Sequence, residues 1–252
     1  MLSLKDKKVL VVGGSSGIGL ATAQSAADAG ARVTIAGRSE ERLKGAVKLL
    51  GNKVEGRRLD ATDDDAVERF FKETGRWDHV VASAGAGGRG RLAEIPMDRA
   101  LAAMDGKFWA YYRIARAADI ASDGSLTFVS GGLSHKPAPS AALVSAVNAA
   151  VEGMTRGLAL DMSPRRVNTV CPGAVDTPLW DQLTPEARKA LYERNAATLP
   201  ARRMGQPEDI AQAILMVMTN PFATGTYCSL RAVRCSCEAG DAQSRKLTYC
   251  SG

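Results

Sequence analysis

A glycine-rich turn near the N-terminus constrains the fold of this chain more than any other segment. The run Gly13-Gly-Ser-Ser-Gly17-Ile-Gly19 follows the short apolar stretch 9–12 and precedes a stretch with helical spacing, 18–29. Glycines at such a turn let the backbone approach a pyrophosphate that lies at the helix N-terminus. The order strand, glycine turn, helix therefore predicts a dinucleotide-binding unit, with an ordinary strand-to-helix turn as the alternative.

Apolar strand patterns alternate with helical patterns along the next two hundred residues. We expect strands at 9–12, 32–36, 54–59, 78–82, 126–129 and 166–170, and helices at 18–29, 40–50, 63–74, 97–121, 141–162 and 207–218. Such alternation predicts an α/β fold with a doubly wound parallel sheet, a three-layer Rossmann fold, in a single domain spanning 1–226.

The residue pattern of the sequence changes at residue 227. The segment 227–252 holds Cys228, Cys235, Cys237 and Cys250 and has no pattern that would complete a sheet. We expect an atypical C-terminal tail and a missing or replaced last strand. A shifted reading frame or a divergent tail would each produce this change.

Composition excludes several classes of protein. The 252 residues are 45% hydrophobic and 24% charged, which is typical of globular proteins and not of disorder. The basic residues that give the net charge of +6 are scattered along the chain, so we expect no nucleic-acid partner.

We expect a cytoplasmic protein for two reasons. No apolar stretch is long enough for a membrane span, and an odd number of cysteines argues against a disulfide framework. The cysteine spacings do not resemble a zinc site, so no metal is expected, and Cys171 is interpreted as a buried small residue.

Over residues 12–226 the chain resembles the short-chain dehydrogenase/reductase family. The resemblance rests on the glycine turn, Leu59-Asp-Ala61, Ala82-Ser-Ala-Gly85, Arg166-Val-Asn168 and Pro172-Gly-Ala-Val-Asp-Thr-Pro178. It implies a nicotinamide cofactor and residues in each motif that contact this cofactor. These residues are Gly13, Ser15, Ser16, Gly17, Ile18, Gly19, Asp60, Ala61, Ala84, Gly85, Pro172, Gly173, Val175 and Thr177.

The residues after the second expected strand favour NADP(H) over NAD(H). A free ribose 2′-hydroxyl prefers a carboxylate acceptor there, whereas a 2′-phosphate needs a cation. The chain has Gly37 at that position, followed by Arg38 and Ser39. Arg38 can pair with a phosphate in bidentate fashion, and a solvated arginine at the start of a helix is the alternative.

The resemblance implies a catalytic Tyr-x-x-x-Lys pair, and the alignment places Val144 and Asn148 at its two positions. The family's serine aligns with Gly131, one residue after Ser130, and its asparagine aligns with Lys107. We therefore take Ser130 as the residue that orients the substrate, and Lys107 or His135 as the source of charge or a proton. A surface Lys107 and a solvated His135 are the alternatives, while His79 is expected to pack in the sheet.

These observations predict an NADP(H)-dependent oxidoreductase that transfers hydride between the nicotinamide and a small carbonyl, alcohol or imine. An iminium carbon accepts hydride without forming an oxyanion, so it does not require the tyrosine and lysine. The alternative is a catalytically degenerate NADP-binding regulatory or scaffold protein. We also expect a homodimer or homotetramer that pairs through Phe108–Tyr112, for which a substrate-contacting aromatic wall is the alternative.

Overall fold

The computed structural model describes residues 3–51, 53–85 and 88–230. These residues form a seven-stranded sheet of order β3-β2-β1-β4-β5-β6-β7, and every neighbouring pair is parallel. The strands are β1 (Lys8–Val12), β2 (Arg32–Gly37), β3 (Val54–Arg58), β4 (Trp77–Ala82), β5 (Ile120–Val129), β6 (Arg166–Pro172) and β7 (Tyr227–Leu230). The predicted doubly wound sheet is confirmed.

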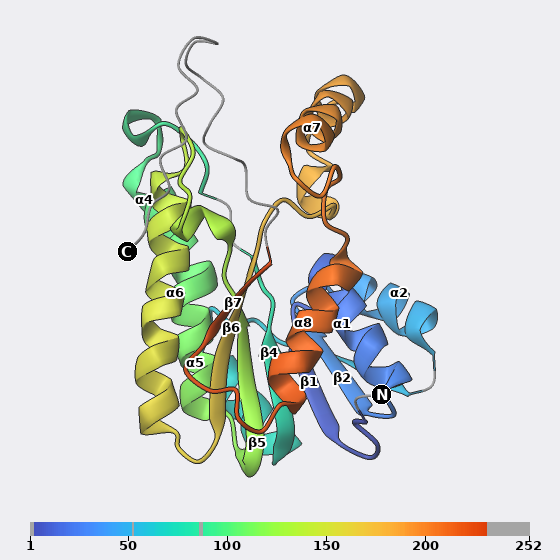
Figure 1. The fold of residues 1–252 in the computed structure, drawn as a ribbon. Coiled ribbons are helices and arrows are strands. Elements are labelled where there is room, and N and C mark those ends of the chain that lie inside the picture. Colours follow the sequence, from blue (N-terminus) through green and yellow to red (C-terminus); the bar gives the residue numbers. More distant parts are fainter. Residues whose placement is uncertain (1–2, 52, 86–87, 231–252) are drawn as a thin grey trace, which may run out of the picture.

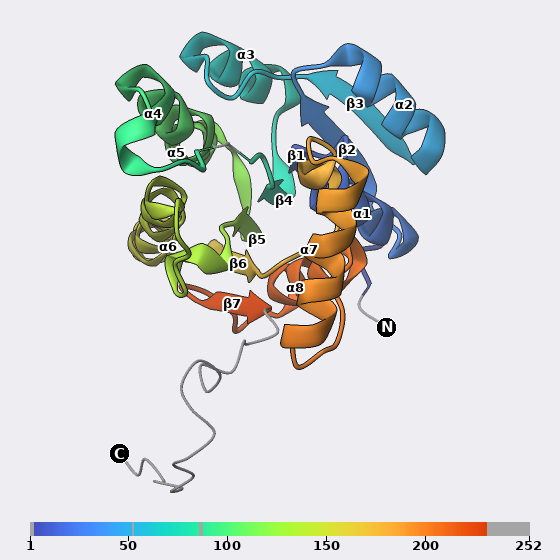
Figure 2. The same ribbon diagram turned by 90° about the horizontal axis from the view of Figure 1, so that it is seen from above.

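Helices cover both faces of the sheet (Figures 1 and 2). They are α1 (Gly17–Asp28), α2 (Glu40–Leu50), α3 (Asp64–Thr74), α4 (Met97–Met104), α5 (Ala110–Ala117), α6 (Ala142–Asp161), α7 (Pro185–Thr198) and α8 (Pro207–Thr219). One core cluster joins the sheet to α1, α2 and α8, and a second joins it to α3, α5 and α6. Helix α7 lies beyond the carboxyl ends of the strands, above the sheet in Figure 1. None of the helices in the described ranges has the length and apolarity that a membrane crossing requires.

The long helix expected at 97–121 is interrupted and ends early. A wide π-helical turn, Asp105–Trp109, separates α4 from α5. The helix stops at Ala117 although alanine favours helix, because Ile120 is fully buried in the core as the first residue of β5. Tertiary packing therefore overrides local propensity here.

Of the two expectations for the last strand, missing or replaced, the first was wrong, because β7 completes the sheet. The amide of Thr169 donates to Thr226 O at 2.9 Å, and the amide of Gly173 donates to Leu230 O at 2.9 Å. Since main-chain pairing holds this edge strand and its residues are mostly exposed, no apolar alternation marks it in the sequence. Residues Cys235, Cys237 and Cys250 lie outside the described residues.

Strand β6 anchors the C-terminal end of α8 through Arg166. The buried guanidinium donates to Val217 O at 2.8 Å, to Asn220 O at 2.9 Å and to Met218 O at 2.6 Å. A cation at this end of a helix satisfies carbonyls that have no partner within the helix.

Replacing Arg166 by alanine is expected to lower the free energy of unfolding by about 3 kcal/mol, because it removes three short hydrogen bonds and leaves these carbonyls only the longer contacts from Asn168, Ser125 and Ala223. Urea unfolding followed by circular dichroism measures the change. Arg156→Ala, on the exposed face of α6, is the control and should change the stability by less than about 0.5 kcal/mol. Equal effects of the two substitutions would contradict the anchoring role.

Candidate active site

The glycine turn packs too closely to accept side chains. A Cβ at Gly13, whose φ is +84°, would lie 2.8 Å from Ala84 N, and one at Gly19 would lie 2.1 Å from Gly13 O. Ser16 is the N-cap of α1 and makes no side-chain cap hydrogen bond. The bare backbone and the uncapped first turn of α1 together suit a bound phosphate.

Segments that are far apart in the sequence meet at this turn. A Cβ at Gly17 would lie 3.3 Å from Thr177 Cγ2, and one at Gly37 would lie 3.9 Å from Ser15 Oγ. The turn is thus bordered by the end of β2 and by the segment that follows β6. The other predicted cofactor residues are Ile18, partly buried against the core; Ser39, the N-cap of α2; Ala61, buried; Gly85, with open space around its Cα; Pro172, the last residue of β6; Gly173, paired with Leu230; and Val175, bridged to Gly205.

Two arginines act electrostatically on Asp60, just beyond the end of β3. Burial raises the pKa of Asp60, but hydrogen bonds from Thr62 and the charges of Arg38 and Arg58 outweigh it, so the pKa lies below its ordinary value. Arg58 pairs in register with Gly37 at the ends of β3 and β2. Sequence reasoning missed Arg58, although its place immediately before Leu59-Asp60 was the available signal.

Lys107 is buried, so the surface alternative for this residue is wrong. It lies within the π-helical turn, and its Nζ donates to Ser130 O at 2.9 Å and to Asn148 Oδ1 at 2.8 Å. Burial lowers the pKa of Lys107 to about 8, against the opposing effect of the acidic groups of Cys171 and Glu152. An ammonium with this pKa can exchange a proton near neutral pH.

Asn148 on α6 faces the end of β5. A Cβ at Gly131 would lie 2.8 Å from Asn148 Nδ2, so glycine at 131 leaves room for this amide. Asn148 is buried and accepts from Lys107, while Val144 lies one turn earlier on the same helix and is partly buried.

Glu152, one turn after Asn148, was missed by sequence reasoning. Its buried Oε1 accepts from Ser130 Oγ at 2.9 Å and from Ser134 Oγ at 2.6 Å, and its Oε2 lies 2.8 Å from His135 Nε2. His135 is an exposed residue whose side chain is 26% exposed and pairs with Glu152, so the imidazole is in part solvated. The i, i+4 spacing from Asn148 was the only signal for Glu152 in the sequence.

His79 packs within the sheet, as expected. It is buried, and its Nδ1 lies 2.9 Å from Ser125 Oγ. Burial lowers the pKa of His79 to about 4, so the imidazole is neutral at physiological pH. Nothing about this position indicates a catalytic role.

Helix α7 is tied to the segment that follows β6. Arg188 donates to Asp176 Oδ1 at 3.1 Å and to Asp181 Oδ1 at 3.0 Å, and the Tyr192 hydroxyl also donates to Asp176. These contacts hold the helix beyond the strand ends, next to the segment that carries Thr177.

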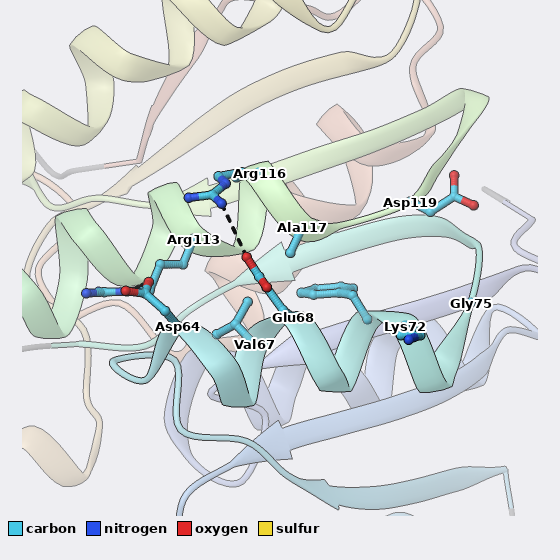
Figure 3. Close-up of a pocket in the computed structure, with 10 residues that line it drawn as sticks. Asp64, Val67, Glu68, Lys72, Gly75, Arg113, Arg116, Ala117 and Asp119 are labelled. Carbon is cyan, nitrogen blue, oxygen red and sulfur yellow. Dashed lines mark hydrogen bonds and ion pairs between the residues drawn. The ribbon is translucent and has the colours of Figure 1, made fainter.

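A groove of about 490 Å³ runs between α3 and α5 (Figure 3). Ion pairs cross it from Arg113 to Asp64 and from Arg116 to Glu68. Its lining contains none of the residues predicted for the cofactor or for catalysis. The groove is therefore separate from the candidate active site.

A family model described as enoyl-(acyl carrier protein) reductase matches residues 12–229. The chain belongs to the short-chain dehydrogenase/reductase family. It is 30% identical over 243 residues to the short-chain dehydrogenase/reductase ATR9 of Stachybotrys chlorohalonatus, covering 90% of this chain and 96% of that one. The solved MalC reductase/Diels-Alderase of Malbranchea aurantiaca matches with a TM-score of 0.84 at 29% identity, covering 91% of this chain and 96% of that one. A small-chain dehydrogenase solved in complex with NADPH matches with a TM-score of 0.75 at 29% identity, covering 90% and 98%.

The chain thus belongs to a family of oxidoreductases whose members act on small molecules with a nicotinamide cofactor. The TM-scores of the solved relatives agree with the fold of this chain. The relatives leave open the choice of cofactor and the roles of Lys107, Ser130 and His135.

Replacing Gly19 by alanine is expected to destabilise the fold by about 2 to 3 kcal/mol and to weaken dinucleotide binding, because its Cβ would collide with Gly13 O. Thermal melting and calorimetric titration measure the two effects. Gly45→Ala, at an exposed helical position with nothing within 4 Å, is the control and should stabilise by up to about 1 kcal/mol. Unimpaired binding by the Gly19 variant would contradict this account of the turn.

Proposed function

We propose that this chain is an NADP(H)-dependent oxidoreductase, and that it reduces a small carbonyl or imine without a Tyr-x-x-x-Lys pair. The observation that carries the proposal is the buried ammonium of Lys107 at the end of β5, bonded to Ser130 O and Asn148 Oδ1. Burial of this ammonium costs free energy, and the pKa of about 8 that results makes Lys107 a candidate proton donor near neutral pH.

The preference for NADP(H) is supported by cations at the ends of β2 and β3. Arg38 and Arg58 both act on Asp60, and the chain has Gly37 where a carboxylate would repel a 2′-phosphate. The structural relative in complex with NADPH agrees with this preference. We assign the phosphate to Arg38, with Arg58 as a second cation.

The catalytic proposal is an exchange of side chains between two positions. The family resemblance implies asparagine at 107 and lysine at 148, whereas this chain has Lys107 and Asn148. Lys107 Nζ donates to Asn148 Oδ1 at 2.8 Å, so the ammonium and the amide are neighbours. In this chain the ammonium comes from the π-helical turn and the amide from α6, the reverse of what the resemblance implies. The ammonium is thereby retained near the active site although its position in the sequence has changed.

Bound NADPH supplies the hydride for the reduction. For a carbonyl substrate, Lys107 donates one proton to the oxygen as hydride reaches the carbon, so the product is an alcohol and the lysine becomes neutral. Ser130 holds the ammonium through its carbonyl oxygen, and Asn148 holds it through the amide oxygen. We assign His135 an indirect role: it contacts Glu152, and Glu152 accepts a hydrogen bond from Ser130 Oγ. An iminium substrate takes the hydride alone and leaves the proton on Lys107.

Exposed aromatic residues support the expected homo-oligomer. Trp109 is 47% exposed and Tyr112 is 44% exposed, and their rings meet edge to face at 5.9 Å. We assign them to an interface between copies of this chain.

Replacing Arg38 by aspartate is expected to reverse the cofactor preference, because a carboxylate repels the 2′-phosphate and accepts from a 2′-hydroxyl. Calorimetric titrations with NADPH and NADH give the affinity ratio. Lys48→Asp makes the same charge change in the last turn of α2 and should leave the ratio unaltered. An unchanged ratio in the Arg38 variant would remove the argument for NADP(H), and binding of neither dinucleotide to the native protein would overturn the cofactor site.

Carbonyl reduction is expected to depend on the protonation of Lys107. Because only the ammonium donates, kcat/KM should be level below pH 8 and should fall about tenfold per pH unit above it. Lys107→Met should lower the rate by about a hundredfold or more and abolish this pH limb. Lys72→Met, on the exposed side of α3, is the control. Reduction that is independent of pH from 7 to 9.5 would favour the iminium substrate, and tight NADPH binding without turnover on either substrate class would favour the regulatory alternative.

Converting Val144 to Tyr and Asn148 to Lys tests the alignment. The double variant alone would bring two ammonium groups together, because Asn148 already contacts Lys107. The triple variant Lys107→Asn, Val144→Tyr, Asn148→Lys is therefore expected to reduce carbonyls faster than Lys107→Met, with the double variant less stable than the triple. A triple variant no more active than Lys107→Met would contradict the proposed exchange.

A further inference from the structure

A cluster of metal-ligating groups adjoins Ser130 in the candidate active site and includes His135 and Glu152. His135, Glu152 and Cys171 come from the loop after β5, from α6 and from β6, and one ligand atom of each lies within 4.8 Å of the others. Glu152 Oε1 lies 3.4 Å from Cys171 Sγ, and Glu152 Oε2 lies 2.8 Å from His135 Nε2. The glycine turn and Lys107 contribute no atom to this cluster.

We propose that His135, Glu152 and Cys171 form a binding site for a divalent transition metal of the zinc class. Imidazole, carboxylate and thiolate are the ligands that Zn²⁺ prefers, whereas a thiolate does not suit Mg²⁺ or Ca²⁺. Zinc-to-ligand distances of about 2.0 to 2.3 Å place the ligands of a tetrahedral ion roughly 3.3 to 3.7 Å apart. The distance from Cys171 to Glu152 falls in this range. His135 contacts the other carboxylate oxygen, Oε2, at 2.8 Å, and the three ligand atoms lie within 4.8 Å of one another. Binding one tetrahedral ion therefore requires side-chain movements of up to about 1 Å.

The surroundings of Glu152 fit a metal ligand. Ser130 and Ser134 both donate to Oε1, and hydroxyl donors of this kind hold a ligating carboxylate in one orientation. Glu152 and Cys171 are buried, whereas the His135 side chain is 26% exposed. The cluster is therefore closed on the protein side and opens to solvent at the histidine.

The charges balance when the site is filled. The metal replaces the proton of the Cys171 thiol, and that proton goes to solvent. A dication with one thiolate, one carboxylate and one neutral imidazole has no net charge, so its burial is not opposed by an unpaired charge. Three protein ligands leave the fourth position for water or an exogenous donor.

The sequence contained no signal for this site. Its ligands lie 17 and 19 residues apart in the chain, as their numbers in the sequence show, and not at the short spacings of zinc motifs. The fold brings them together because β5, α6 and β6 are adjacent.

Titration of the full-length protein with Co²⁺ tests the proposal without any need for hydride transfer. Cys235, Cys237 and Cys250 are replaced by serine so that the remaining thiols are Cys171 and Cys228. We expect the visible bands of tetrahedral Co²⁺ and a near-ultraviolet thiolate-to-cobalt band, saturating at one ion per chain. One equivalent of Zn²⁺ should bleach both.

Cys171→Ser should abolish the thiolate band, and His135→Gln should weaken Co²⁺ binding at least tenfold. Cys228→Ser, at the other free cysteine of the described residues, is the matched control and should leave the band intact. Circular dichroism verifies that each variant is folded, and His135→Gln, on a partly exposed loop, keeps the test valid if Cys171→Ser does not fold.

The proposal is overturned by an absent thiolate band in the parent protein. It is also overturned by a band that survives Cys171→Ser or disappears in Cys228→Ser, because the metal would then be adventitious. If NADPH fails to bind while Co²⁺ binds as expected, the proposed reductase function fails and the metal site stands.

Discussion

The contact between Gly19 and Gly13 sets the geometry on which the rest of the structure depends. A Cβ at Gly19 would lie only 2.1 Å from Gly13 O. The start of α1 therefore packs directly against the residue that follows β1. The first turn of α1 is thereby held at the carboxyl ends of the strands, where the segments that follow β4 and β6 begin. Thr177 and Ala84 meet the glycine turn there, so one close backbone approach gathers the residues of the candidate cofactor site.

The fold was predictable because it depends on local patterns. Alternating strand and helix signals gave the sheet, and α2 has the predicted bounds 40–50. The predictions were poorer where tertiary contacts decide. Ile120 leaves the expected helix to be buried in β5, and β7 forms through main-chain hydrogen bonds that no side-chain pattern records.

The catalytic region was less predictable, because its contacts join residues far apart in the chain. Lys107 and Asn148 could be placed by alignment, but their 2.8 Å contact, which makes the pair interpretable as an exchange, requires the packed helices. Glu152 gave no sequence signal beyond its helical spacing, since a buried carboxylate is recognisable only once its donors are known. Burial then changes the chemistry of these groups, as the lowered pKa of Lys107 shows.

Strand β7 has a consequence for how this chain tolerates change. The strand is held through its peptide groups, and its side chains are mostly exposed. The position is therefore specified by an extended backbone of the right length more than by particular residues. A change of reading frame after residue 226 would replace side chains here without removing the hydrogen bonds that close the sheet. Such a change would affect the stacking of Tyr227 on His135, at 4.8 Å between ring centroids, and the packing of Cys228 against the core. Many side chains are thus compatible with the last strand, because its place in the sheet is held mainly by the peptide backbone.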